Sequence, residues 1–411
     1  MATTPKTPRS QKPLSACSAD GVNGVGARAD DAVGLLDRVR EVVPLIAERA
    51  AEAEEQRKPA DDVIHALERT GVFRSFVPAR FGGYEIDLEL FVDIGVAVSE
   101  ACPSTGWITT FYMEHNWLLG LFGDELHDEV FGSQPYVLAP GTVNASGEAT
   151  PVDGGYELTG QWQFGTGVVH ADWVVLSARI VGDDSEVARM FLVPAGEIEV
   201  KDTWHVDGMA ATGSRDIIAR SVFVPALRRS NIPPPTWLLP LDDPYLRRIP
   251  MRPFLALTAA IPALGCARRS VELFGQRMTK RVLFGTTKLQ AETTPAQIRL
   301  ANLTVRTSIA ETQMRTVARE MTAHARGETQ LSFLDHLKMG VTIAHVVRMC
   351  RDIVRDVMEA SGAGAHFLDN ELQRIHRDMH MISAHTIFDV DAAAIPLGRE
   401  LLRTMADEHR H

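Results

Sequence analysis

The feature that most constrains this chain is a block of β-rich sequence enclosed between two long helical regions. From residue 31 to about 102, apolar residues recur three or four positions apart, which predicts helices that pack through one face. Short runs rich in β-branched and aromatic residues, separated by turn residues, fill 136–225. Helical spacing returns over 255–405. The chain is therefore predicted to be mainly α with a central β domain, a barrel or a sandwich, followed by a C-terminal helical bundle.

The same changes in texture set the predicted domain boundaries. Residues 1–29 are rich in Ser, Thr, Pro, Gly and Ala and are predicted to be a disordered tail. We assign 30–133 to an N-terminal helical domain, 134–235 to a middle β domain and 236–411 to the C-terminal bundle. Prolines crowd 225–253 and predict irregular structure there, because proline lacks a backbone N–H and fixes φ.

Capping residues locate individual helices in the first domain. Asp61 is a predicted N-cap, and Gly71 is the predicted left-handed C-cap of the same helix. A further helix is expected from Asp87 to Ala101. Pro44 is expected to kink or restart the helix that precedes them.

Charge, cysteine content and hydropathy exclude several classes of partner. Lys and Arg total 42 against 53 for Asp and Glu, so the net charge of −11 has the wrong sign for a nucleic-acid backbone. The four cysteines are far apart and form no CxxC pair, which predicts a reducing, cytoplasmic setting. The longest apolar stretch, Phe254–Ala267, contains Pro262 and is shorter than the ~20 residues that cross a bilayer. Neither nucleic acid nor a membrane is an expected partner.

Common catalytic signatures are missing from the sequence. There is no GxxxxGK[ST], HExxH or GxSxG, and the glycine-rich run Gly21–Gly26 has no strand before it. His376 and His380 have a spacing compatible with a metal on one helix face, but polar pairs at this spacing are common on helices. No metal site is predicted.

A set of motifs nevertheless occurs in a characteristic order. Phe164–Gly167, Trp204–Ser214, Arg281–Gly285 and Ser361–Gly364, followed by the pair Arg377-Asp378, resemble motifs of the acyl-CoA dehydrogenase superfamily. The resemblance runs in order from about residue 31 to 401. It implies an acyl-CoA-dehydrogenase-like fold, in which the C-terminal region is a four-helix bundle.

Within this superfamily, the chain is most similar to the reduced-flavin-dependent aromatic monooxygenases, the oxygenase halves of two-component systems such as p-hydroxyphenylacetate hydroxylase. Ser104–Trp107 followed by His115 resembles their Ser-x-Gly-Trp and downstream histidine, and Asp202–His205 also resembles their sequence. Where a dehydrogenase has Tyr-Glu-Gly with its catalytic glutamate, this chain has His385-Thr386. The resemblance therefore implies hydroxylation of a phenolic or polycyclic aromatic substrate through a flavin C4a-hydroperoxide.

The resemblance also indicates catalytic residues. His385 and His115 are the candidates for the group beside the peroxide and the group beside the substrate hydroxyl, and the order of these roles stays open. A neutral imidazole can accept a phenol proton in the useful pH range. Thr166 occupies the position of a hydroxyl that meets flavin N5 in the superfamily. The alternatives are hydrogen-bonded core histidines and an ordinary strand threonine.

Further residues are implied as flavin ligands. Trp204 resembles the aromatic residue that flanks the isoalloxazine ring, and Thr142 is expected along the pyrimidine edge. Phosphate would be bound by the charge of Arg281 and by the backbone N–H groups of the glycine loop. The residues assigned in this loop are Ser361, Gly362 and Gly364. The alternatives are a core tryptophan at 204 and a surface salt bridge at 281.

The resemblance implies reduced FMN as the cofactor, with FAD possible, a separate NAD(P)H-flavin reductase, molecular oxygen and a homotetrameric assembly. Three other functions stay open. They are an N-hydroxylating or nitroso-forming flavin monooxygenase, an acyl-CoA dehydrogenase, and a non-catalytic helical assembly protein that retains the fold.

Overall fold

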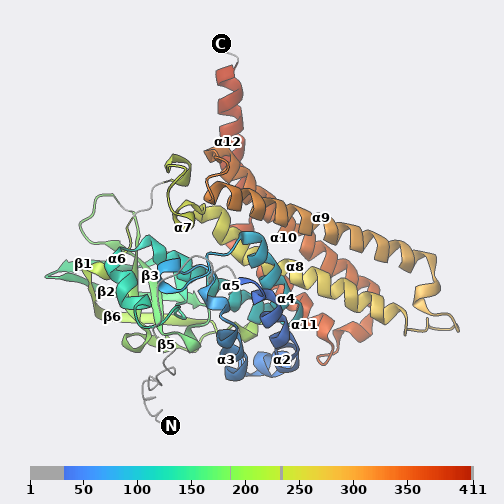
Figure 1. The fold of residues 1–411 in the computed structure, drawn as a ribbon. Helices are drawn as coiled ribbons and strands as arrows, with labels where there is room; N and C mark the ends of the chain where they lie inside the picture. The colour runs from blue at the N-terminus through green and yellow to red at the C-terminus, as the bar shows by residue number, and fades with distance from the viewer. Residues whose placement is uncertain (1–31, 186, 232–234, 409–411) are drawn as a thin grey trace, which may run out of the picture.

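A computed structural model describes residues 32–185, 187–231 and 235–408, and the predicted tail 1–29 lies outside these residues. Figure 1 shows the β-sheet at one side of the molecule and three long helices of the C-terminal region extending to the other. Most of the N-terminal helices lie between them (Figure 1). The fold is mainly helical with a central sheet, which confirms the predicted fold class.

Among the described residues, the N-terminal region contains five labelled α-helices. They are α2 (Leu35–Gln56), α3 (Asp61–Thr70), α4 (Leu88–Ala101), α5 (Pro103–Leu118) and α6 (Asp124–Phe131). Gly71 caps α3 with φ 82, as predicted, but Ala60 rather than Asp61 is its N-cap, because the Asp61 carboxylate instead contacts Lys58 and His170. Helix α2 continues through Pro44, which lies on its exposed side. There the carbonyl that loses its helical partner can reach water.

The middle region forms one six-stranded mixed sheet. Its strands are β1 (Gly141–Val152), β2 (Gly155–Gly165), β3 (Trp173–Ile180), β4 (Arg189–Pro194), β5 (Glu199–Lys201) and β6 (Arg215–Pro225). Their order is β4-β3-β1-β2-β6-β5, with only β1 and β3 parallel among these pairs. Trp162, Phe191 and Ile217 are fully buried in a separate apolar core beneath the sheet. The pairing of β2 with β6 shifts register between Trp162 and Gly165, which bends the end of β2.

The α-helices in the described part of the C-terminal region are one short helix and five longer ones. They are α7 (Tyr245–Arg248), α8 (Met251–Met278), α9 (Thr294–Ala325), α10 (Phe333–Ser361), α11 (Glu371–Ser383) and α12 (Val390–Glu408). Helix α12 projects from the body in Figure 1. The irregular structure predicted up to Pro253 ends earlier than expected, since Pro253 lies in the first turn of α8, where proline is tolerated.

Helix α8 is the central element of this region. By length and composition it could cross a membrane, but 78% of its most apolar window is buried inside the protein. It packs against α4, α5, α9, α10 and α11. Its apolar surface is therefore part of the protein core. Through α8, helix α5 of the N-terminal region is packed against the C-terminal helices, including α11.

Candidate active site

The end of strand β2 presents Thr166 in a strained, partly exposed turn. Phe164 has φ 65, which is uncommon for a residue with a side chain, and its ring is 63% exposed. Gly165 lies so close to β6 that an added Cβ would be 2.6 Å from the Ile217 side chain. A residue larger than glycine at this position would therefore require the Ile217 side chain to shift. The Thr166 hydroxyl lies 3.2 Å from the Ser214 hydroxyl.

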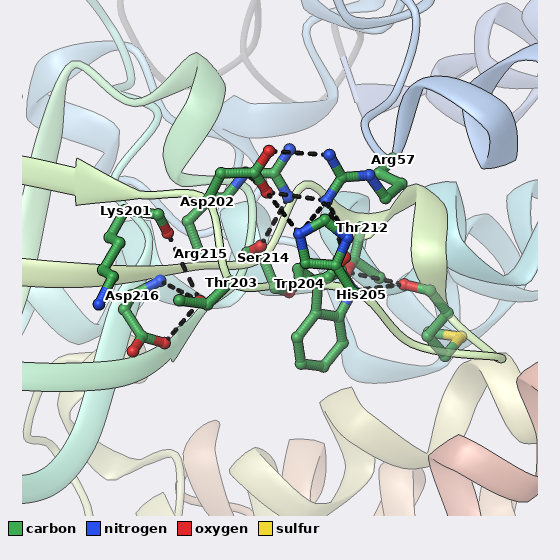
Figure 2. Close-up of polar contacts among 11 residues, drawn as sticks. Arg57, Lys201, Asp202, Thr203, Trp204, His205, Thr212, Ser214, Arg215 and Asp216 are labelled. Carbon is green, nitrogen blue, oxygen red and sulfur yellow. Dashed lines mark hydrogen bonds and ion pairs between the residues drawn. The ribbon is translucent and has the colours of Figure 1, made fainter.

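The loop between β5 and β6 holds Trp204 beside this turn. The indole N–H of Trp204 donates to the Met209 carbonyl (3.0 Å), and the Thr212 hydroxyl donates to the same oxygen (2.9 Å). Thr212 and Ser214 are joined by a 2.8 Å hydroxyl contact. Phe164 packs edge-on against Trp204 with ring centroids 5.9 Å apart. The contacts of Phe164 and of Ser214 therefore join the turn that carries Thr166 to the loop that carries Trp204. Figure 2 shows Trp204, Thr212 and Ser214 in this loop.

An arginine from the N-terminal region anchors this loop. Arg57, which follows helix α2, forms two 2.8 Å hydrogen bonds to the Asp202 carboxylate and a third, of 3.2 Å, to the Trp204 carbonyl. Arg215 approaches the same carboxylate at 3.2 Å (Figure 2). The hydrogen bond from Arg57 lowers the pKa of Asp202. Sequence reasoning missed Arg57, because it lies about 145 residues from its partner.

Helix α5 carries a row of rings that ends at His115. Trp107, Phe111 and His115 are four residues apart and share one face of the helix. Trp107 stacks on Phe111 at 4.8 Å, and Phe111 lies 5.5 Å from His115 between ring centroids. His385, which follows α11, lies 5.8 Å from Trp107. The two predicted histidines therefore flank one aromatic surface, although the sequence separates them by most of two domains.

The hydrogen bonds of the two histidines imply opposite tautomers. The Nδ1 atom of His115 lies 2.8 Å from the Ala139 carbonyl, which can only accept, so in neutral His115 the lone pair is on Nε2. The Nδ1 atom of His385 accepts from the Ile387 backbone N–H at 3.3 Å, so its Nε2 carries the hydrogen. Burial lowers the pKa of His115 to about 4. Surrounding protein also lowers the pKa of His385, although its ring remains open to solvent.

Two buried polar groups near His115 have no hydrogen-bond partner among the described residues. Neither oxygen of Glu114 makes a hydrogen bond, although Oε2 lies 3.4 Å from Nε2 of His115. Complete burial raises the pKa of Glu114 well above its ordinary value, so its carboxyl group is uncharged. The hydroxyl of Thr142, the predicted pyrimidine-edge residue, is similarly buried and unpaired. Sequence reasoning missed Glu114, although a glutamate on an otherwise apolar helix face was a usable signal.

A third cluster joins Arg281 to the glycine loop. Arg281 and Arg277 both donate to the Ser361 carbonyl, at 3.1 and 2.8 Å. Among the ion pairs of the described residues, none involves either arginine. Gly362 adopts φ 68, and Gly364 approaches Arg277, whose terminal nitrogen would lie 3.1 Å from an added Cβ. The salt bridge that was the alternative for Arg281 is thus not formed here, and Arg277 is an addition that sequence reasoning missed.

Helix α5 connects the turn that carries Thr166 with the aromatic row between His115 and His385. The cluster of Arg277, Arg281 and the glycine loop lies elsewhere. The Tyr112 hydroxyl on α5 donates to the Gly167 carbonyl next to Thr166 at 2.6 Å. Near the start of α8, the Thr258 carbonyl accepts from Thr110 on α5. Arg281 follows the other end of α8. The part of α8 from Thr258 to Met278 is ~30 Å long, at about 1.5 Å per residue. Within one chain, Arg281 is therefore not brought to Thr166.

The described part of the chain holds no group of three or more His, Cys, Asp or Glu side chains arranged for a metal ion. His376 and His380 contact each other through their Nε2 atoms at 3.1 Å, without a third ligand.

The residues present fit a flavin. Trp204 offers an aromatic surface beside the Thr166 hydroxyl, and the unpaired Thr142 hydroxyl is a free polar group of the kind that a ring edge can satisfy. Arg277 and Arg281 form a cationic pair without a carboxylate, which suits a phosphate group. The aromatic row between His115 and His385 suits a flat apolar substrate.

These features define a class of protein, the flavin-dependent monooxygenases with the acyl-CoA dehydrogenase fold. Residues 257–390 match the family described as "Acyl-CoA dehydrogenase, C-terminal domain". The chain is 32% identical over 372 residues to the pigment production hydroxylase of Rhodococcus sp. (strain ATCC 21145), covering 89% of this chain and 95% of that protein. It belongs to the family of flavin-dependent monooxygenase oxygenase components that includes such relatives.

Two further proteins illustrate this family. The chain is 28% identical over 378 residues to the p-hydroxyphenylacetate 3-hydroxylase oxygenase component of Acinetobacter baumannii, covering 90% of this chain and 89% of that one. The structure of XiaF from Streptomyces sp. in complex with FADH2 and glycerol superimposes with a TM-score of 0.86 at 27% identity, covering 92% and 98% of the two chains. This protein is a reduced-flavin-dependent monooxygenase.

Proposed function

We propose that this enzyme hydroxylates a phenolic or polycyclic aromatic substrate on the surface formed by Trp107 and Phe111. The observation that carries the proposal is the pair of neutral histidines with opposite tautomers at the two ends of that surface. One presents a lone pair and the other an N–H group. A dehydrogenase would instead need a carboxylate base, and Thr386 occupies that position.

The tautomers support a division of roles that the sequence left open. Nε2 of His115 accepts the proton of the substrate hydroxyl, because its lone pair is free and its Nδ1 is fixed by Ala139. Nε2 of His385 donates a hydrogen bond at the other end of the aromatic surface. Flavin, when bound in its reduced form, supplies the activation of molecular oxygen.

The remaining predicted residues hold the cofactor. Thr166 would offer its hydroxyl to the flavin ring, Trp204 would flank the ring, and Thr142 would bind the ring edge. Arg281 and the glycine loop bind phosphate, with Arg277 as an additional ligand. Since Arg281 lies beyond the far end of α8, we propose that it serves the flavin of a neighbouring subunit in a homotetramer.

We propose reduced FMN as the cofactor, delivered by a separate NAD(P)H-flavin reductase. Reduced FAD is the second candidate, because the XiaF structure contains FADH2. The "oxygenase component" in the name of the Acinetobacter relative supports a separate reductase. The described cysteines Cys102, Cys266 and Cys350 are free thiols, which supports a reducing cytoplasmic setting.

The direct test supplies the purified protein with a flavin reductase, NADH, oxygen and a panel of phenols, with FMN and FAD in parallel. We expect oxygen uptake with a hydroxylated product that exceeds the hydrogen peroxide released. Peroxide alone with every phenol, together with N-oxidation of an aromatic amine, would replace this proposal by N-hydroxylation. Reduction of an electron acceptor by an acyl-CoA would establish a dehydrogenase instead.

A further inference from the structure

A buried carboxyl group of the C-terminal bundle reaches into the loop that carries Trp204. Asp378 on α11 is 3% exposed, and its Oδ1 accepts the backbone N–H of Met209 at 2.5 Å. Met209 has φ 53, a conformation that side-chain-bearing residues rarely adopt without external support. Asp378 therefore contacts the loop at its most strained backbone position.

This contact is the first link of a chain that ends at the proposed flavin residues. The Met209 carbonyl accepts from both Trp204 and Thr212. The Thr212 hydroxyl meets that of Ser214, which in turn meets that of Thr166. A shift of the Met209 backbone would therefore move Trp204 directly. It would move Thr166 through the hydroxyl groups of Thr212 and Ser214.

The backbones of α11 and the loop are also in direct contact. An added Cβ at Gly208 would lie 2.3 Å from the Arg377 carbonyl, so only glycine allows this approach. The Arg377 guanidinium donates to the Asp207 carbonyl and pairs with Glu54 of α2 at 2.5 Å. Burial is costly for the Asp378 carboxyl, whose pKa it raises to about 7, and the bond to Met209 opposes this shift. The free-energy cost of burying this carboxyl group indicates that Asp378 has a specific role, which is to accept the Met209 N–H.

We propose that Asp378 is a positioning residue, which holds the loop 204–214 so that Trp204 and Thr166 face the flavin. The loop conformation is a property of the protein alone, whereas its consequence for turnover rests on the proposed function. The two can therefore be tested separately.

The first test measures amide hydrogen exchange in the protein without flavin. Asp378→Ala removes the acceptor for Met209, and we expect exchange in peptides covering 204–214 to accelerate about tenfold, relative to peptides of β3. Asp378→Asn keeps a side-chain carbonyl and should retain slow exchange. Equal exchange in the wild type and Asp378→Ala would overturn the proposal.

A matched control separates positioning from a general loss of stability. Thr322 also accepts a backbone N–H across two elements, from Leu88 at 3.1 Å, in a buried place away from the loop. Thr322→Val should lower the melting temperature without changing exchange in 204–214. If Asp378→Ala does not fold, Gly208→Ala disrupts the same contact from the loop side and should accelerate the same peptides. Unchanged exchange in Gly208→Ala would then contradict the proposal.

The second test uses the reductase-coupled reaction. Asp378→Ala should lower the ratio of hydroxylated product to hydrogen peroxide by about tenfold, and Ser214→Ala should do so too. The double variant should be no worse than the poorer single variant, because both changes break one chain of contacts. Additive losses would show that Asp378 acts by another route. If the wild type forms no product, the proposed function fails while the exchange result still decides the role of Asp378.

Discussion

The two ends of helix α8 contain sites of opposite electrostatic character. Near its start, next to α5, the polar groups are buried and uncharged, with a low pKa at His115 and a raised pKa at Glu114. At its other end, Arg277 in the last turn and Arg281 just beyond it both donate to the Ser361 carbonyl, and neither forms an ion pair among the described residues. The first site suits proton transfer with an aromatic molecule in a dry environment, and the second suits an anionic group.

The two sites also differ in which regions of one chain supply their residues. The α5 site gathers residues of all three regions within one chain, including His115, Thr166 and His385. At the arginine site, Arg277 and Arg281 both donate to the Ser361 carbonyl, and none of His115, Thr166 and His385 contributes to that cluster. The proposal that both sites bind one flavin molecule therefore includes a second copy of the chain.

The largest effect is expected at the histidines. His385→Ala should reduce hydroxylated product by about 100-fold or more, the usual effect of losing an acid or base group, while circular dichroism stays that of a folded protein. His115→Ala should divert oxygen consumption into hydrogen peroxide, since the substrate hydroxyl loses its acceptor. Product yield and peroxide are measured in the same assay. Normal hydroxylation by both variants would assign the two histidines to structure alone.

The next largest effect is expected at the arginine site. Arg281→Ala should weaken flavin binding by roughly 10- to 100-fold, because charge-assisted hydrogen bonds contribute ~1.5–3 kcal/mol. Arg277→Ala should behave similarly. Fluorescence titration measures the flavin affinity. The His115→Ala and His385→Ala variants should bind flavin normally.

Mixing two variants tests whether the sites are shared between subunits. Arg281→Ala and His385→Ala chains that exchange in one tetramer should form some sites free of both changes and regain activity above either parent. Verified exchange without recovery would place Arg281 in the same subunit's site or away from flavin.

The pH dependence sharpens the contrast in charge. With a pKa of about 4, His115 stays neutral at pH 6–8 and is protonated only as the pH falls toward 4. Product yield should therefore be insensitive to His115 ionisation over pH 6–8 and decline below about pH 5. A decline centred at pH 6.5 in the ratio of product to peroxide would indicate an ordinary, solvated histidine.

At Glu114 we expect the smallest effect on activity, together with a change in stability. Its folded-state pKa is raised above the unfolded value, so the stability it contributes is present below about pH 4.5 and is lost as pH rises toward the folded-state pKa. Glu114→Gln removes this loss. Between about pH 4.5 and the folded-state pKa of Glu114, the free energy of unfolding of Glu114→Gln minus that of the wild type should increase by up to about 1.4 kcal/mol per pH unit. Denaturant unfolding at pH 5 and 8 measures it, and a constant difference would mean that Glu114 is already ionised.

Some of the candidate site could be read from the sequence because its signals are local. Thr166 and Trp204 lie in short motifs whose order resembles one superfamily, and the structure brings them together. Arg57 could not be found in this way, and the motif that contains Asp378 did not reveal its contact with Met209. Arg57 is one of many charged residues in a helical region, and each makes its contact with a residue more than 140 positions away.

The sequence by itself determined the class of fold, because helical and strand periodicities are properties of neighbouring residues. It also indicated the kind of chemistry, through a resemblance in which His385-Thr386 replaces the Tyr-Glu of a dehydrogenase. Only the tertiary structure decided the proton positions on His115 and His385, since these depend on Ala139 and on the backbone of Ile387. It likewise decided that Arg281 lies far from Thr166, because the length and direction of a packed helix set that separation.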